Sequence, residues 1–292
     1  MAGIKIEESL PSKEYHANKA ISKSRLDRIH KSIECDQVPW GEPTASMILG
    51  SALHTAFLER DKFEDEYYVI KGLGLKKDFV SDYLSKHKGC KKKDADLAWD
   101  DHKKEHEELN EHHKGKTLLT ENQLETVGKM VDKLANYPVT KKLFEDGKPE
   151  VSLFWDQLDI ECKARPDWVT ERKGEGRYLI DLKTTIDASP EGFPRSVLKY
   201  RYHVQAAWYL KAARICYGEE IADFIFLVVE NKPPYSVGAY TLGPASLDEG
   251  WSLADQDLRK YKAWLDDPDH VPTGYIDSIQ QIDIPPSGFT QF

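Results

Sequence analysis

Arg165-Pro166-Asp167-Trp168-Val169 and Ile180-Asp181-Leu182-Lys183-Thr184-Thr185 are the two stretches that decide the fold of this chain. Apolar residues alternate or cluster in strand fashion in and before both stretches, and Lys173-Gly174-Glu175-Gly176 supplies a turn between them. We therefore predict a β-hairpin that brings Asp167 back beside Asp181 and Lys183. Because successive side chains of a strand point to opposite faces, Asp181 and Lys183 project from the same face.

Two carboxylates and an ammonium group on one hairpin have the composition of a site for phosphodiester hydrolysis. The carboxylates of Asp167 and Asp181 can hold a divalent ion, which polarises the phosphate and acidifies a water molecule. The ammonium of Lys183 can position that water or neutralise the charge that develops in the transition state. The alternative is a solvated strand end, because an Asp-x-Lys tripeptide occurs by chance in most proteins.

The order of three short motifs resembles the catalytic core of the PD-(D/E)xK nuclease superfamily, in its RecB-like and RecE-like branch. The motifs are Pro166-Asp167, Asp181-Leu182-Lys183 and Gln205-Ala206-Ala207-Trp208-Tyr209. The resemblance covers residues 20–60 and 149–241, and it is most specific at 165–209. It implies an α/β fold with a restriction-endonuclease-like core, in which a central mixed sheet is flanked by helices and joined to an N-terminal helical portion.

Two residues upstream of the hairpin match the same branch. His54 follows Gly50 on a predicted helix, and the resemblance implies that its imidazole is a metal ligand. A packed or surface histidine is the alternative. Glu150 matches a glutamate that these families place at the edge of the active site. Glu161 competes with it, because Glu161 is closer to Asp167 in the sequence, and we prefer Glu150.

Gln205 and Tyr209 are four residues apart on the predicted helix that follows, so their side chains share one face. The resemblance implies that this face packs behind the active site and helps to hold the lysine or the DNA backbone. Simple amphipathic packing is the alternative, and both can hold at once. Tyr202 and His203, just before this pair, are candidates for contact with DNA.

Two further stretches are most similar to the exonuclease VIII (RecE-type) nucleases of phage and prophage recombination. They are Ser22-Lys23-Ser24-Arg25-Leu26 and Tyr200-Arg201-Tyr202-His203-Val204-Gln205. Ser22, Ser24 and Arg25 lie at a predicted helix N-terminus, where free N–H groups and the helix dipole favour an anion such as a terminal phosphate. Helix capping by one serine, with Arg25 in solvent, is the simpler alternative.

The resemblance implies a Mg²⁺-dependent deoxyribonuclease that degrades linear double-stranded DNA from the 5′ end during recombination. Asp167 and Asp181 would hold the metal with His54 and the carbonyl oxygen of Leu182, and Glu150 would support a second metal or its waters. Oxygen ligands with one imidazole suit Mg²⁺ or Mn²⁺ better than Zn²⁺. Expected partners are duplex DNA, a single-strand annealing protein and further copies of the chain.

Two other functions fit the same residues. A structure-specific or restriction-like endonuclease would use the same core. A nuclease-fold DNA-binding subunit would have lost the chemistry, and the presence of Asp167, Asp181 and Lys183 together argues against it.

The net charge of −9 is unusual for a protein that binds DNA, which normally carries a basic surface. Basic groups are concentrated in one segment, and they are Lys71 with Lys76-Lys77, Lys86-His87-Lys88 and Lys91-Lys92-Lys93. This segment can form a basic rim on an acidic protein, because local charge governs contact with phosphates. A solvated helix face is the alternative.

Composition is that of a globular protein, with 40% apolar and 31% charged residues in 292. We expect one nuclease domain over 1–292, with a mainly helical portion at 1–148, a catalytic core at 149–241 and a C-terminal helix and tail at 242–292. No apolar run approaches the ~20 residues that span a bilayer. The four cysteines are scattered and the N-terminus lacks a signal-peptide pattern, so we expect a reduced, cytoplasmic protein.

Periodicity and capping residues predict the remaining elements. Helices are expected at 22–35, 44–59, 120–138, 195–217 and 247–265, and strands at 150–156, 159–169, 177–184, 223–230 and 235–241. Residues 1–20 are expected to be a loosely held arm, and 72–118 a polar helical excursion.

Overall fold

The structure is a computed structural model that describes residues 3–70, 76–113, 115–170, 176–218, 221–275, 279 and 281. Its strands are β1 (Lys5–Glu7), β2 (Tyr67–Ile70), β3 (Thr117–Thr120), β4 (Gly147–Pro149), β5 (Ser152–Gln157), β6 (Ile160–Ala164), β7 (Trp168–Thr170), β8 (Arg177–Thr185), β9 (Ile221–Glu230) and β10 (Val237–Tyr240). Its helices are α1 (Ser12–Ala17), α2 (Lys23–Lys31), α3 (Ile33–Gln37), α4 (Ala45–Leu58), α5 (Phe63–Glu66), α6 (Lys76–Lys86), α7 (Lys92–His112), α8 (Glu121–Asn136), α9 (Pro138–Leu143), α10 (Phe193–Lys199), α11 (Tyr202–Tyr217) and α12 (Pro244–Asp266), with a 3₁₀ turn at Arg60–Lys62.

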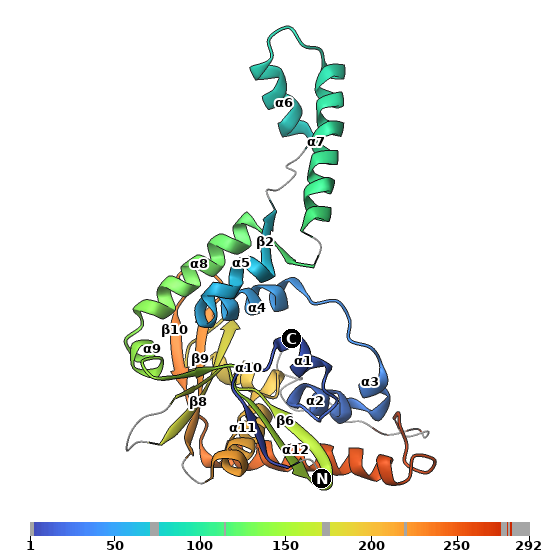
Figure 1. Cartoon of the computed structure of the whole chain (residues 1–292), viewed down its shortest axis with the longest axis vertical. Coiled ribbons are helices and arrows are strands. Elements are labelled where there is room, and N and C mark those ends of the chain that lie inside the picture. The colour runs from blue at the N-terminus through green and yellow to red at the C-terminus, as the bar shows by residue number, and fades with distance from the viewer. Residues whose placement is uncertain are drawn as a thin grey trace.

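A mixed five-stranded sheet, in the order β10-β9-β8-β7-β4, forms the centre of the molecule (Figure 1). Strands β8 and β9 are parallel, and the other neighbours in this sheet are antiparallel. A second sheet of three antiparallel strands has the order β1-β5-β6, and β2 pairs with β3 in parallel. The predicted α/β architecture with a mixed sheet is therefore confirmed.

Side-chain alternation along β8 divides the core between the two faces of the central sheet. Leu179 packs into the cluster that includes α11 and α12, whereas Ile180 and Leu182 pack into the cluster that includes α4 and α8. Because the period is two, Asp181 and Lys183 face the same side as Leu179. The sheet therefore presents its functional side chains toward α11.

One predicted strand, 159–169, is wrong, because it forms two strands in two different sheets. Strand β6 pairs with β5, and β7 pairs with β8. Pro166 lies in the break between them, and proline cannot donate the N–H that a continuous ladder needs. The predicted turn at Lys173–Glu175 lies outside the described residues, but the antiparallel pairing of β7 with β8 agrees with the predicted hairpin.

The N-terminal segment is packed, which corrects the prediction of a loosely held arm. Strand β1 pairs with β5, and Tyr15 of α1 is buried. The ammonium of Lys163 donates hydrogen bonds to the carbonyl oxygens of Tyr15 (2.6 Å) and Asn18 (2.8 Å). These contacts join segments that are far apart in the sequence, so local patterning could not predict them.

Two predicted helices are each divided. Ser32 separates α2 from α3, and its side chain accepts the N–H of Cys35 as an N-cap. Arg201, with a left-handed φ of 53°, separates α10 from α11. By contrast, α4 and α8 begin where their capping residues predict, at Thr44 and at the capping box of Thr120.

The polar excursion predicted at 72–118 contains the helices α6 and α7. Figure 1 shows them as a hairpin that projects from the end of the molecule, beyond β2 and β3. Among the residues described, no helix combines the length and the apolar character needed to cross a bilayer.

Candidate active site

The candidate site lies at the edge of β8 where β7 has ended. Trp168, the first residue of β7, pairs with Ile180, so the later residues of β8 pair only with β9 among the described strands. Asp167 occupies the place next to this open edge. Its Oδ2 accepts a hydrogen bond of 2.6 Å from the backbone N–H of Leu182. The carboxylate of Asp167 thus accepts the hydrogen bond that a backbone carbonyl of β7 would accept if the β7–β8 pairing continued.

Helix α4 brings His54 to the same edge from the other side. Its Nε2 lies 2.7 Å from the carbonyl oxygen of Leu182, and its Nδ1 lies 3.4 Å from Oδ2 of Asp167. Gly50, one turn earlier, lies against β8, since a Cβ built there would be 3.7 Å from Oγ1 of Thr184. The small residue therefore keeps α4 close enough for the imidazole to reach the strand.

Glu150 enters the site from the link between β4 and β5. Its backbone N–H donates a hydrogen bond of 3.0 Å to the carbonyl oxygen of Asp167, and its φ of 52° is in the left-handed region. Its Oε2 lies 3.8 Å from Nη1 of Arg165, which is itself held by Ser152. The competing residue, Glu161, is exposed on β6 in the other sheet.

His54, Glu150 and Asp167 each offer one ligand atom, and these atoms lie within 4.8 Å of one another. Two carboxylates and an imidazole, with the Leu182 carbonyl oxygen beside them, form a donor set suited to Mg²⁺ or Mn²⁺. The donor chemistry therefore fits the metal that the sequence predicts. This cluster contains Glu150 in addition to Asp167 and His54, whereas Asp181 lies outside it.

Asp181 is held by residues of its own strand and of α11. The ammonium of Lys183 pairs with its Oδ2, and Nε2 of Gln205 donates a hydrogen bond of 2.5 Å to its Oδ1. Tyr209 is hydrogen-bonded to Gln205 from the next turn of the helix. The Gln-x-x-x-Tyr face therefore lies directly behind the Asp-x-Lys motif, where it fixes the orientation of the buried Asp181 carboxylate.

The charges of the site shift one another's pKa values. Burial opposes protonation of His54, but the Asp167 carboxylate outweighs it and raises the His54 pKa to about 9. Burial and the nearby Asp167 raise the pKa of Glu150 to about 8. Burial raises the pKa of Asp181 to about 6, although Lys183 opposes this. Without a metal ion, the site therefore retains protons that a bound cation would displace.

Tyr202 and Lys23 extend the site on the Lys183 side. The ammonium of Lys183 lies 5.0 Å from the centre of the Tyr202 ring, and the ammonium of Lys23 lies 5.8 Å from it. Lys23 also pairs with Asp27 (2.7 Å) and donates to the carbonyl oxygen of Tyr200 (2.8 Å). No sequence pattern singles out Lys23, although it lies between Ser22 and Ser24 of the predicted phosphate-binding motif.

Two of the three residues predicted to bind a terminal phosphate, Ser22 and Arg25, have structural partners instead. The side chain of Ser22 caps α2 by accepting the N–H of Arg25 (3.3 Å), and Ser24 is exposed. The Arg25 guanidinium forms an ion pair with Asp36 and donates to the carbonyl oxygen of Lys19. His203, considered for DNA contact, is buried, and its backbone carbonyl lies against Gly250 of α12. The structure therefore favours the capping alternative at Ser22.

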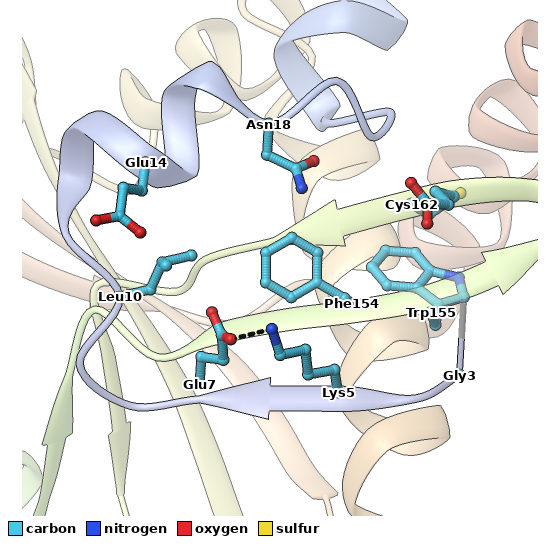
Figure 2. A pocket seen from close by; sticks show the side chains of 10 residues that line it. Gly3, Lys5, Glu7, Leu10, Glu14, Asn18, Phe154, Trp155 and Cys162 are labelled. Atoms are coloured by element: carbon cyan, nitrogen blue, oxygen red, sulfur yellow. Dashed lines mark ion pairs between the residues drawn. The ribbon is translucent and has the colours of Figure 1, made fainter.

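A separate cavity of about 420 Å³ lies on the three-stranded sheet, under the N-terminal segment (Figure 2). Lys5 and Glu7 of β1 line it with Phe154 and Glu161 from β5 and β6. Figure 2 shows the ion pair between Lys5 and Glu7 along β1, at one side of the cavity. None of the residues of the candidate site lines this cavity, so it is not part of the same chemistry.

Fold and site together define a protein of the PD-(D/E)xK nuclease class. The chain belongs to the family described as a PDDEXK-like domain of unknown function, DUF3799, whose model matches residues 19–278. This confirms the superfamily that the sequence motifs predicted. No curated protein matches the chain.

Two solved structures are similar to this one. The first is a crystal structure from Eubacterium rectale described as a candidate exonuclease, with a TM-score of 0.58 and 13% identity over 97% of this chain and 98% of that chain. At this identity it is evidence about the fold alone. The second, of SSO0001, has a TM-score of 0.30 and 15% identity over 73% of this chain and 84% of that chain, which is too low to support any argument.

Proposed function

We propose that this chain is a Mg²⁺-dependent deoxyribonuclease that degrades linear double-stranded DNA from the 5′ end in recombination. The observation that carries the proposal is the position of the His54, Glu150 and Asp167 cluster beside the Asp181–Lys183 ion pair, at the open edge of β8. The cluster has the composition of a metal site, and the ion pair places the ammonium of Lys183 next to it. Both lie where β7 has ended, so that among the described strands only β9 pairs with this part of β8.

His54, Glu150, Asp167 and the Leu182 carbonyl oxygen would hold the ion, which supplies Lewis-acid polarisation of the phosphate and an acidified water. Lys183 is oriented by Asp181 and by the ring of Tyr202, so its ammonium is available to position a water or to stabilise negative charge on the phosphate. Asp181 keeps that ammonium protonated, because burial lowers the Lys183 pKa less than the nearby carboxylates raise it.

The finer parts of the proposal rest on resemblance. Action from the 5′ end, on duplex DNA, follows from the likeness to the RecE-type motifs at 22–26 and 200–205. The Eubacterium rectale protein, which shares the fold, is described as a candidate exonuclease, and we propose the same activity for this chain. We also propose a single-strand annealing protein as the partner that takes up the 3′ strand, and a homo-oligomeric enzyme.

The experiment compares linear duplex DNA, labelled at the 5′ or the 3′ end, with closed circular DNA, in Mg²⁺ and in chelator. We expect Mg²⁺-dependent loss of the 5′ label first, with no cutting of the circle. The Asp167→Asn variant is the control for contaminating nucleases. Cutting of the circle would identify an endonuclease, and loss of the 3′ label first would reverse the proposed polarity.

A further inference from the structure

The hairpin of α6 and α7 is a packed unit that extends away from both sheets (Figure 1). Its two helices are held together by aromatic contacts, since the ring of Phe79 lies 5.3 Å from that of Trp99 and 4.9 Å from that of His102. Ala95 and Trp99 are buried between the helices. An interior of this kind makes the hairpin a stiff projection, and the 21 residues of α7 span about 32 Å at ~1.5 Å per residue.

Charge is separated along this hairpin. Its outer end, residues 86–93, carries five exposed lysines, namely Lys86, Lys88, Lys91, Lys92 and Lys93. Two acidic residues flank this end: Asp82 pairs with Lys86 (2.8 Å), and Asp94 follows Lys93. Farther along α7 toward the body of the molecule, residues 100–108 carry five exposed acidic side chains, namely Asp100, Asp101, Glu105, Glu107 and Glu108, against two lysines, Lys104 and the Lys103 that pairs with Asp100. The chain as a whole has a net charge of −9, so this basic tip differs in sign from the rest of the protein.

The hairpin is connected to the part of the molecule that carries the candidate site. Its two ends lead to the paired strands β2 and β3, and Tyr67 and Leu119 from these strands are buried in one cluster with α4 and α8. His54 lies on α4. A ligand held at the basic tip is therefore bound by the same chain segment that follows the site helix α4 and leads into α8.

We propose that residues 86–93 bind the phosphate backbone of duplex DNA at a distance from the end that is being cut. The proposal rests on the nuclease function proposed above. Duplex DNA presents one negative charge per ~1.7 Å, so a cluster of lysines gains affinity by displacing its counterions. The acidic side chains of α7 repel the same backbone, which confines contact to the tip. With α7 alone about 32 Å long and ~3.4 Å per base pair, the contact falls at least about ten base pairs from the end.

The test uses a variant with Lys88, Lys91, Lys92 and Lys93 changed to Gln. A matched control changes four exposed lysines elsewhere, Lys13, Lys31, Lys133 and Lys141, to Gln, so that both variants lose the same charge. Binding is measured with hairpin-closed duplexes of about 6 and about 24 base pairs, in Ca²⁺ to prevent cleavage, over a range of salt concentrations. Cleavage of both duplexes is then measured in Mg²⁺.

We expect the tip variant to bind the long duplex at least tenfold more weakly than the control variant at moderate salt. The slope of log affinity against log salt should become shallower by about 0.9 for each phosphate that the variant no longer neutralises. Binding and cleavage of the short duplex should match those of the control, because that duplex does not reach the tip.

If the tip variant lost the same amount of affinity for the short and the long duplex, the proposal would be overturned. The lysines would then act near the site or through net charge alone. Unchanged binding of the long duplex by the tip variant would also overturn the proposal. An acidic protein would then be the better candidate for the ligand of the basic tip. Failure of the nuclease function is a different result, in which the wild-type protein cleaves neither duplex in Mg²⁺.

Discussion

Gln205 donates a hydrogen bond of 2.5 Å from Nε2 to Oδ1 of Asp181, across the boundary between α11 and the central sheet. The other oxygen of the same carboxylate pairs with Lys183. Asp181 is therefore fixed at both oxygens, one by the motif itself and one by the helix behind it. The glutamine thereby controls the orientation of the Asp–Lys pair without itself belonging to the metal cluster.

Replacing Gln205 by Leu should lower kcat about tenfold and change KM little, because the Asp181 carboxylate loses one of its two anchors. A Gln205→Asn variant keeps the amide but shortens the side chain, so its kcat should lie between those of the wild type and of Gln205→Leu. Gln256→Leu, on the exposed face of α12, is the matched control. Steady-state kinetics on linear duplex DNA measures the effect, and a change confined to KM would contradict a positioning role.

Lys183→Ala should reduce the single-turnover cleavage rate by about 10²–10³-fold while DNA affinity in Ca²⁺ stays within a few-fold of wild type. The reason is that the ammonium is expected to act on charge that develops during the reaction rather than on bound substrate. Exposed Lys133→Ala is the control. A Lys183 variant that cleaves at the normal rate but binds poorly would show that this lysine is a phosphate contact.

Divalent metal should stabilise the folded protein, because the ion binds the ligands that only the folded chain brings together, His54, Glu150 and Asp167. At a metal concentration of about 100 times Kd the gain is about 2.7 kcal/mol in the free energy of unfolding. Thermal unfolding with Mg²⁺ or Mn²⁺ and with chelator measures it. Asp167→Asn should abolish the shift, whereas the exposed Asp269→Asn should retain it. A wild-type protein with the same melting temperature in metal and in chelator would count against this site.

Metal affinity should rise with pH between about 6 and 9. The His54 pKa is raised from its usual value to about 9 by Asp167, and burial raises the Glu150 pKa to about 8, so both groups are protonated at pH 6. Each must lose its proton to bind the ion, so binding at low pH is opposed by the displaced protons. Calorimetric titration with Mn²⁺ at pH 6.5 and pH 8.5 tests this, and affinity that is independent of pH would contradict it.

Ser22→Ala should lower the free energy of unfolding by about 1 kcal/mol, because α2 loses the acceptor that caps its first turn. The neighbouring Ser24→Ala, at an exposed position, should change it by less than about 0.5 kcal/mol. Neither variant should change any preference between 5′-phosphorylated and 5′-hydroxyl ends. Denaturant unfolding and end-labelled cleavage assays measure the two effects. A lost end preference in the Ser22 variant would restore the phosphate-binding hypothesis.

Sequence alone predicted the parts of this molecule that depend on local patterns. The period of two along β8 placed Asp181 and Lys183 on one face, and Thr44 and Thr120 marked the starts of two helices. The spacing of Gln205 and Tyr209 predicted their shared face. The metal cluster was predicted only in part, because its members come from α4, the β4–β5 link and the residue before β7.

The features that sequence reasoning missed depend on contacts between distant segments or on backbone conformation. Asp36 as the partner of Arg25 and Tyr200 as the acceptor for Lys23 become visible only when the helices pack. The left-handed conformation of Glu150 has no sequence signal, because the residue is not glycine. The break at Pro166 did have such a signal, since a proline inside a predicted strand indicates that the ladder is interrupted.

The open edge of β8 also bears on solubility. A strand edge with free backbone groups is a template for pairing with another chain, and proteins usually protect such edges. Here Asp167 accepts the N–H of Leu182, and His54 contacts its carbonyl oxygen, so both backbone groups of Leu182 are engaged. Asp167 and His54, which we propose as metal ligands, thereby also hinder edge-to-edge aggregation of the sheet. Inactive variants made by truncating either residue to alanine would expose that edge, and Asn or Gln replacements that keep a polar group there are the better choice.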